Sequence, residues 1–267
     1  TSFHSPSGLA VDEKYLYAAG FFMKGGVKLA HAVYRTEWQA ASPGKPEPFI
    51  GEPETPGKDE KHLNEPLDLA VDAQGNIYVC DAGNRRLAVF KPEGVFLKAV
   101  PIPEGRPLRL VISPDGKTAY VTAGVPGSDN KRTSWKHTLL KVSVETGAIA
   151  ARLEFPPPLL TRDWRAETIV PLSCGDFGGE KPALWIAQPG VGAEDLWRVE
   201  DRGEVLEKVW ALPGERGWHL HVRAGDALSA DPYTGHLYAR FFPANDRGPA
   251  QRKTDEYDRW SRCSPET

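Results

Sequence analysis

The sequence predicts an all-β fold in which a unit of four short antiparallel strands recurs along the chain. Two observations lead to this prediction: the strand-and-turn pattern of residues 65–100, and the partial repetition of that pattern before and after it. A unit of this kind cannot bury both of its faces alone, so we expect neighbouring copies to stack on one another.

The stretch 65–100 contains four apolar runs separated by turn residues. In the first run, 67–71, apolar residues alternate with polar or small ones, and Gly and Asn follow. The other runs cover 77–79, 87–90 and 95–100, and a Pro-Glu-Gly turn precedes the last one. Alternation at period two, interrupted by Gly, Asn and Pro, indicates a meander of antiparallel strands.

The second strand of this unit has counterparts elsewhere. Each counterpart places one aromatic residue between small or branched apolar residues, and the five aromatics are Tyr17, Tyr78, Tyr120, Trp185 and Tyr238. They are 61, 42, 65 and 53 residues apart. A bare four-stranded unit needs roughly 40–50 residues, so the longer steps carry insertions. The sequence therefore predicts about five units.

The composition agrees with a β-rich globular chain. The 267 residues include 26 Gly and 24 Pro, which supply frequent turns, and 40% are hydrophobic. The formal net charge of -3 gives no basic stripe, so we expect no nucleic-acid partner. No window has the roughly 18 apolar residues of a bilayer-spanning helix, so we expect no membrane span.

Residues 65–90 resemble an NHL repeat. The shared residues follow the order of that repeat: Pro66, Asp68, Gly75, Asn76, Tyr78, Val79, Asp81, Gly83, Asn84 and Arg86. Residues 6–20 resemble its first half. Residues 106–124 resemble the related YVTN-type surface repeats through their Ser-Pro-Asp-Gly-Lys turn and Tyr-Val pair.

This resemblance implies a β-propeller of four-stranded antiparallel blades, and families with these repeats include many binding modules. We expect a single propeller domain over 1–267. Its blades should cover roughly 6–52, 65–104, 106–156, 166–213 and 221–267. The last blade is incomplete. Either the five blades close the ring, or the chain is part of a longer ring, such as one of six blades, and we favour the second interpretation.

Most of the shared residues are sufficiently explained by structure. Asp81, Asn84 and Arg86 can form a network that holds a tight turn and pins the second strand to the third. Asp72, Ser113 and Asp231 stand where a side chain can bond the backbone of the first hairpin.

The tryptophans of the second half have two interpretations, packing between blades or an exposed binding patch. Cys80 lies at a strand end and is expected to be a buried thiol.

Ligand-binding candidates lie at the leading position of each first strand, which in a propeller faces the mouth of the central channel. In the first three units these positions hold Gly8, Asp68 and Arg109, and in the last unit approximately His221 or Asp226. Asp68 and Arg109 could meet as a structural salt bridge. The alternative is a polar mouth that binds an anionic or polar small molecule, with the Arg109 guanidinium as the forked donor.

A metal site is the other candidate. His219 and His221 share one face if 218–222 is a strand, and Asp226 could complete a site for zinc or calcium with open positions. Because His-x-His is common on solvated strands and spacing fixes no third ligand, the metal-free interpretation is favoured.

Two groups of propeller enzymes provide the catalytic alternative to a binding module. Gluconolactonase-like hydrolases hold a divalent metal with Glu, Asn and Asp, but Arg109 stands where an Asn would precede the Ser-Pro-Asp-Gly turn. Peptide-amidating lyases are NHL-type propellers with histidine ligands to zinc, and the pair His219 and His221 is the one similarity to them. We therefore favour a non-catalytic module that binds a protein or a small-molecule ligand through its loops and channel mouth.

Three long segments, 23–61, 126–136 and 156–165, are interpreted as insertions between or within blades, where such proteins vary and bind. The expected location is periplasmic or extracellular, although the cysteines do not determine the compartment.

Overall fold

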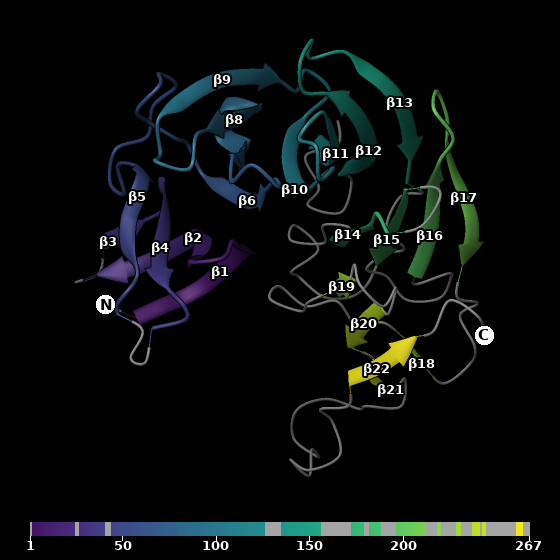
Figure 1. Ribbon diagram of the computed structural model, residues 1–267, viewed down its shortest axis with the longest axis horizontal. Coiled ribbons are helices and arrows are strands. Elements are labelled where there is room, and N and C mark those ends of the chain that lie inside the picture. The colour runs from purple at the N-terminus through teal and green to yellow at the C-terminus, as the bar shows by residue number, and fades with distance from the viewer. Residues whose placement is uncertain are drawn as a thin grey trace. The chain divides into compact units, whose positions relative to one another are not determined.

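The computed structural model confirms the predicted fold class, a β-propeller fold of antiparallel blades (Figure 1). It describes residues 2–24, 27–40, 44–125, 135–155, 172–178, 182–187, 196–211, 218–219, 228–230, 237–240, 242–243 and 260–263. These fall into two compact units, one of Thr1–Val125 with Thr138–Arg152 and one of Pro126–His137 with Leu153–Thr267.

The first blade contains the sheet β1-β2-β4-β5, made of β1 (Ser2–Val11), β2 (Tyr15–Lys24), β4 (Ala32–Glu37) and β5 (Glu47–Gly51), with β3 (Val27–Leu29) paired to β2. The prediction that 23–61 is an insertion was therefore wrong for β3, β4 and β5. Its prolines concealed β5, in which Pro48 stands on the outermost strand of the sheet, where a missing N–H is tolerated.

The second and third blades have the simple meander order. The second consists of β6 (Pro66–Val71), β7 (Ile77–Asp81), β8 (Arg86–Phe90) and β9 (Phe96–Pro101), with a 3₁₀ turn at Ala82–Asn84. The third consists of β10 (Arg106–Ile112), β11 (Thr118–Val125), β12 (Lys136–Ser143) and β13 (Ile149–Glu154). The four strands predicted within 65–100 are thus confirmed.

Two apolar cores join these blades. One core packs Tyr17 and Val33 of the first blade against Leu69 and Phe90 of the second. The other packs residues of the second blade, among them Cys80, against Leu110, Val121 and other residues of the third. Alternate residues of one blade thus belong to different cores, as expected for a sheet that is buried on both faces. The first strands β1, β6 and β10 lie on the inner side of this unit, with β5 and β9 outside (Figure 1).

Side chains fix the hairpins at the starts of the blades, as predicted. Asp72 accepts backbone N–H bonds from Gln74 and Asn76, at 2.9 and 2.8 Å, and a bond from the Tyr78 hydroxyl at 2.9 Å. In the next blade, the Ser113 hydroxyl accepts the Thr118 N–H at 3.0 Å. The third predicted residue of this kind, Asp231, lies outside the described residues.

The second unit contains the sheet β14-β15-β16-β17, made of β14 (Leu172–Asp176), β15 (Ala183–Ala187), β16 (Leu196–Asp201) and β17 (Leu206–Ala211). It also contains the pair β18 (Trp218–His219) and β21 (Phe242–Pro243), and the sheet of β19 (Leu228–Ala230), β20 (Leu237–Arg240) and β22 (Trp260–Cys263). β22 pairs with β20 as the third strand of its sheet.

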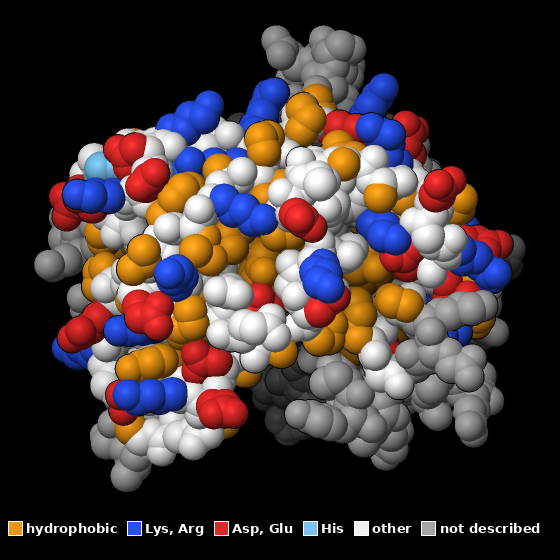
Figure 2. Space-filling model, turned by 45° about the horizontal axis from the view of Figure 1, so that its top comes forward, with side chains coloured by type: hydrophobic (Ala, Val, Ile, Leu, Met, Phe, Trp, Pro, Cys, Tyr) orange, Lys and Arg blue, Asp and Glu red, His pale blue; other side chains and the backbone are white. Residues whose placement is uncertain are grey.

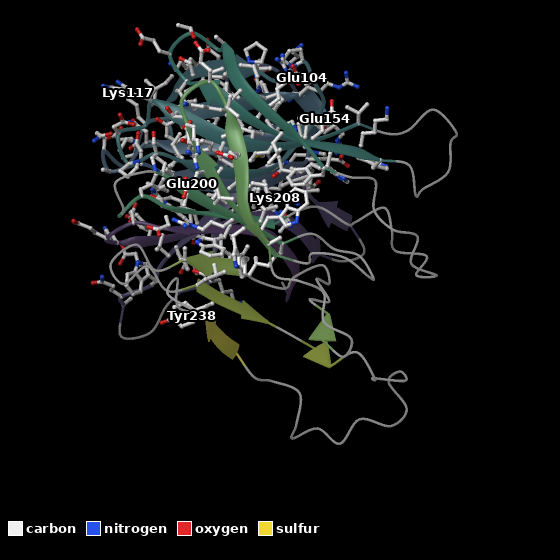
Figure 3. The ribbon with its side chains drawn as sticks, turned by 90° about the vertical axis from the view of Figure 1, so that its right-hand side faces the viewer. Glu104, Lys117, Glu154, Glu200, Lys208 and Tyr238 are labelled. Carbon is white, nitrogen blue, oxygen red and sulfur yellow. The ribbon has the colours of Figure 1, made fainter. Side chains whose placement is uncertain are left out.

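Two tryptophans of this unit belong to its interior. Trp185 and Trp197 are buried, and Trp197 stacks on Phe155 with ring centroids 5.6 Å apart. Lys208, labelled in Figure 3, places its ammonium 4.5 Å from the centre of the Trp197 ring. Packing therefore accounts for Trp185 and Trp197, whereas Trp210 is 37% exposed.

The described surface carries both signs of charge. On the face drawn in Figure 2, Lys and Arg side chains are interspersed with Asp and Glu, and apolar side chains lie between them. Within the described ranges, no helix has the length and apolar character needed to cross a membrane.

Candidate functional site

The three inner strands β1, β6 and β10 share a β-bulge at the same place. In each strand the pairing with its neighbour shifts register directly after a proline, namely Pro6, Pro66 and Pro107. A bulge bends the strand and changes the direction of a side chain. The bulges therefore give Gly8, Asp68 and Arg109 equivalent positions on neighbouring blades, as the sequence comparison predicted.

Asp68 ties the second blade to the third. Its Oδ2 accepts the backbone N–H of Leu110 on β10 at 2.8 Å. Its Oδ1 packs against β1 so closely that a Cβ on Gly8 would lie 2.4 Å away. The Asp68 side chain is half-buried, and this burial raises the pKa of its carboxyl to about 6, although the charge of Arg109 and two backbone amides act in the opposite direction.

Arg109 ties the third blade to the first. Its Nη1 donates to the backbone carbonyl of Ser7 on β1 at 2.9 Å, across a sequence separation of 102 residues. The direct salt bridge that the sequence suggested is not among the contacts of these two described residues. Each charged group binds the backbone of a neighbouring blade instead, and Arg109 lowers the pKa of the Asp68 carboxyl through space.

Four polar atoms of the inner strands and of the strand beside them are buried without a hydrogen-bond partner in the described structure: Ser7 Oγ, Arg106 Nε, Arg109 Nε and Thr122 Oγ1. Thr122 lies on β11 directly opposite Arg109. A buried polar group without a partner costs about 1–3 kcal/mol, so a cluster of four requires an explanation such as a bound ligand or water.

A second charged pair stands at the start of β10. Arg106 Nη2 donates to Glu65 Oε2 at 2.7 Å, and both side chains are partly exposed. The Glu65 backbone has a φ of 52° and donates its N–H to His31 Nδ1 at 3.2 Å. Together, Ser7, Gly8, Glu65, Asp68, Arg106, Arg109 and Thr122 are called the inner-strand site below.

Cys80 lies beside this site, but its thiol is unreactive. It is a fully buried, free thiol on β7, as predicted. Burial raises its pKa well above the usual range, and the charge of Asp68 acts in the same direction. A thiol in this state is protonated at neutral pH and is therefore a poor nucleophile.

The NHL signature residues have the structural role that was predicted. Asp81 and Arg86 face each other on β7 and β8 and form a buried ion pair at 2.6 Å. Arg86 also donates to three backbone carbonyls of the preceding loop, those of Lys58, Asp59 and His62. Asn84 donates to the carbonyl of Gly57 in the same loop at 2.7 Å. The signature thus fixes the loop that leads into the blade, in addition to joining two strands.

The predicted metal ligands are not brought together by the described residues. His219 lies on β18, where its backbone pairs with Phe242. His221 and Asp226 lie outside the described ranges, so the metal site stays a prediction. Among the residues described, no group of three or more His, Cys, Asp or Glu side chains could hold a metal ion.

Sequence reasoning missed Ser7, Glu65, Arg106 and Thr122 as members of the site. The Pro-x-x-Leu spacing common to the three inner strands was a signal for Ser7, because it stands directly after the first of the three prolines. Thr122 had no such signal. Its position opposite Arg109 depends on a register that the bulge shifts by one residue.

Comparison with known families identifies residues 63–90 as an NHL repeat. This segment covers β6, β7 and β8 together with the end of the loop that Arg86 holds. A search of curated proteins gave no match.

Among solved structures, this chain is similar to Kuenenia stuttgartiensis hydrazine synthase, with 16% identity, 87% of this chain and 60% of that chain covered, and a TM-score of 0.49. It is also similar to a Pyrococcus horikoshii acylaminoacyl peptidase, with 11% identity, coverage of 88% and 35%, and a TM-score of 0.48. It is similar as well to a streptogramin B lyase, with 16% identity, 88% of this chain and 76% of that chain covered, and a TM-score of 0.44. The chain thus spans less than two thirds of the hydrazine synthase and peptidase chains.

Proposed function

We propose that this NHL-repeat β-propeller is a binding module that holds a small polar ligand at its inner-strand site. The observation that carries the proposal is the concentration of buried, unpartnered polar atoms there, two of which are guanidinium nitrogens. A polar ligand would supply the missing partners and offset the desolvation of these atoms.

The donor set indicates what the ligand offers. Arg106 and Arg109 each have an Nε–H that has no acceptor among the described groups, and a guanidinium cannot accept a hydrogen bond. The ligand must therefore contribute oxygen acceptors. The hydroxyls of Ser7 and Thr122 can donate or accept, so they add recognition without selecting a charge.

The site favours binding over covalent catalysis. Burial keeps the neighbouring Cys80 thiol protonated. The hydroxyls of Ser7 and Thr122 have no hydrogen-bond partner among the described residues, so no base is placed to activate them. Asp68 and Arg109 are also fixed by backbone bonds to neighbouring blades. A rigid set of donors of this kind loses little entropy when a ligand binds.

A thermal-shift screen of small carboxylates, phosphate esters and neutral sugars, followed by titration of the hits, tests the proposal. We expect the substitution Arg109→Met to weaken binding by about tenfold or more, because hydrogen bonds to charged groups contribute about 1.5–3 kcal/mol.

The matched control is Arg152→Met, because Arg152 is an exposed arginine of the same unit that pairs with Glu104. We expect this variant to bind like the wild type. Equal affinities of the two variants, with both folded by circular dichroism, would contradict the proposal. A screen without any hit would contradict it as well.

A further inference from the structure

We infer that the inner-strand site takes a small organic anion of the carboxylate class, and that protonation of Asp68 strengthens this binding. The inference rests on the proposed ligand site and adds its ligand class and its regulation. It starts from the geometry, in which one carboxylate and one guanidinium of neighbouring strands share a site that contains further unpartnered donors.

The ligand class follows from the guanidinium of Arg109. Its Nη1 is engaged by the Ser7 carbonyl, and its Nε has no acceptor. The open donors of a guanidinium form a planar fork that fits the two oxygens of a carboxylate. The Thr122 hydroxyl, on the residue opposite Arg109, is a further donor that such an oxygen could use.

Asp68 opposes an anion when it is ionised. The other charged groups around it are Arg109 on β10 and the pair of Glu65 and Arg106 at the strand ends. The Cys80 thiol on β7 is neutral. On β1, Ser7 and Gly8 bring no charge. Ionised Asp68 therefore cancels the charge of Arg109, and a bound anion would meet a like charge close by.

Protonation reverses this balance. Because burial raises the pKa of the Asp68 carboxyl to about 6, the group is mostly ionised in neutral solution and mostly neutral at about pH 5. The site then carries the uncompensated charge of Arg109. Oδ2 accepts the Leu110 N–H, so a proton on Oδ1 would leave that bond intact and turn Oδ1 into a donor.

The test is an NMR titration with formate, a carboxylate that stays ionised from about pH 5 to about pH 8. We expect the wild type to bind formate about tenfold more tightly at the lower pH. Asp68→Asn should bind formate tightly at both pH values, because the amide keeps an acceptor for the Leu110 N–H and carries no charge. The matched control Asp115→Asn changes an exposed turn residue and should keep the pH dependence.

A second measurement uses the wild type alone, in case Asp68→Asn does not fold. Thermodynamic linkage requires that an anion favoured by protonated Asp68 also raises the pKa of that carboxyl, by an amount equivalent to the change in affinity. The chemical shift of the Asp68 carboxyl carbon, followed against pH with and without saturating formate, measures this change in pKa. An unchanged pKa would overturn the inference.

The outcomes separate the two proposals. Binding that is lost in Arg109→Met but is equal at both pH values leaves the ligand site standing and overturns the role of Asp68. A pH dependence that persists in Asp68→Asn also overturns that role. If formate does not bind at either pH while neutral sugars do, the site stands and its assignment to carboxylates fails.

Discussion

At Arg86, one guanidinium satisfies a buried carboxylate and three backbone carbonyls. The residue is recognisable in the sequence because this geometry needs a planar group with five donors, which only arginine offers. The most recognisable residue of the repeat therefore stabilises the fold, whereas the proposed ligand binding uses less conspicuous positions such as Ser7.

We expect Arg86→Ala to reduce the free energy of unfolding by about 3–5 kcal/mol, because it leaves Asp81 charged, buried and without its partner. Urea unfolding followed by tryptophan fluorescence measures the change. Arg152→Ala removes the solvent-exposed pair with Glu104 and should have a much smaller effect. Similar losses in the two variants would show that the buried network is not the stabilising element.

The sequence predicted the residues of the site that hold the leading position of each inner strand and missed the others. Asp68 and Arg109 were found because they occupy the same place in a visible repeat, and Gly8 was found with them. The sequence pattern could not predict whether the charges of Asp68 and Arg109 pair directly, because a shift of one residue in a bulge decides which backbone group each side chain reaches.

At the scale of elements, the bulged inner strands hold the blades together as well as presenting the site. Asp68 joins β6 to β10, and Arg109 joins β10 to β1. The close approach of β1 to β6 requires a residue without a side chain at position 8, since a Cβ there would also lie 2.5 Å from the Asp68 Cα. The neighbouring strand β6 therefore requires glycine at position 8.

Gly8→Ala should therefore destabilise the protein by about 1–3 kcal/mol and weaken ligand binding, because β1 must move away from Asp68. Differential scanning calorimetry and the formate titration together measure both effects. Gly44→Ala is the control, as a Cβ at Gly44 would meet no atom within 4 Å. A Gly8→Ala protein as stable as the control would mean that β1 and β6 can separate at little cost.

At the scale of the whole molecule, the burial of a repeat residue depends on its neighbours more than on its identity. Leu69 and Leu110 are 3% and 5% exposed in cores shared with the preceding blade, whereas Leu9, at the equivalent place in the first blade, is 57% exposed. Periodicity in the sequence predicts which residues share a face of a sheet. It carries no information about what covers that face, so the blades were predictable and their packing was not.

We expect ligand binding to survive removal of divalent metals, because the proposed site uses guanidinium and hydroxyl donors. Dialysis against EDTA, followed by the same titration and by elemental analysis, tests this expectation. A stoichiometric metal that disappears in His219→Ala and His221→Ala, together with loss of binding, would instead support the metal-dependent hydrolase or lyase.

The shared bulge has a consequence for how such a protein can change its preference. The backbone delivers position 8, 68 or 109 to the same place whether the residue is glycine, aspartate or arginine. Position 8 has no room for a Cβ beside Asp68, whereas positions 68 and 109 carry side chains. Exchanging the side chains at 68 and 109, with Gly8 and the prolines kept, therefore offers a combinatorial route to new ligands, and library selection would yield variants that differ in what they bind.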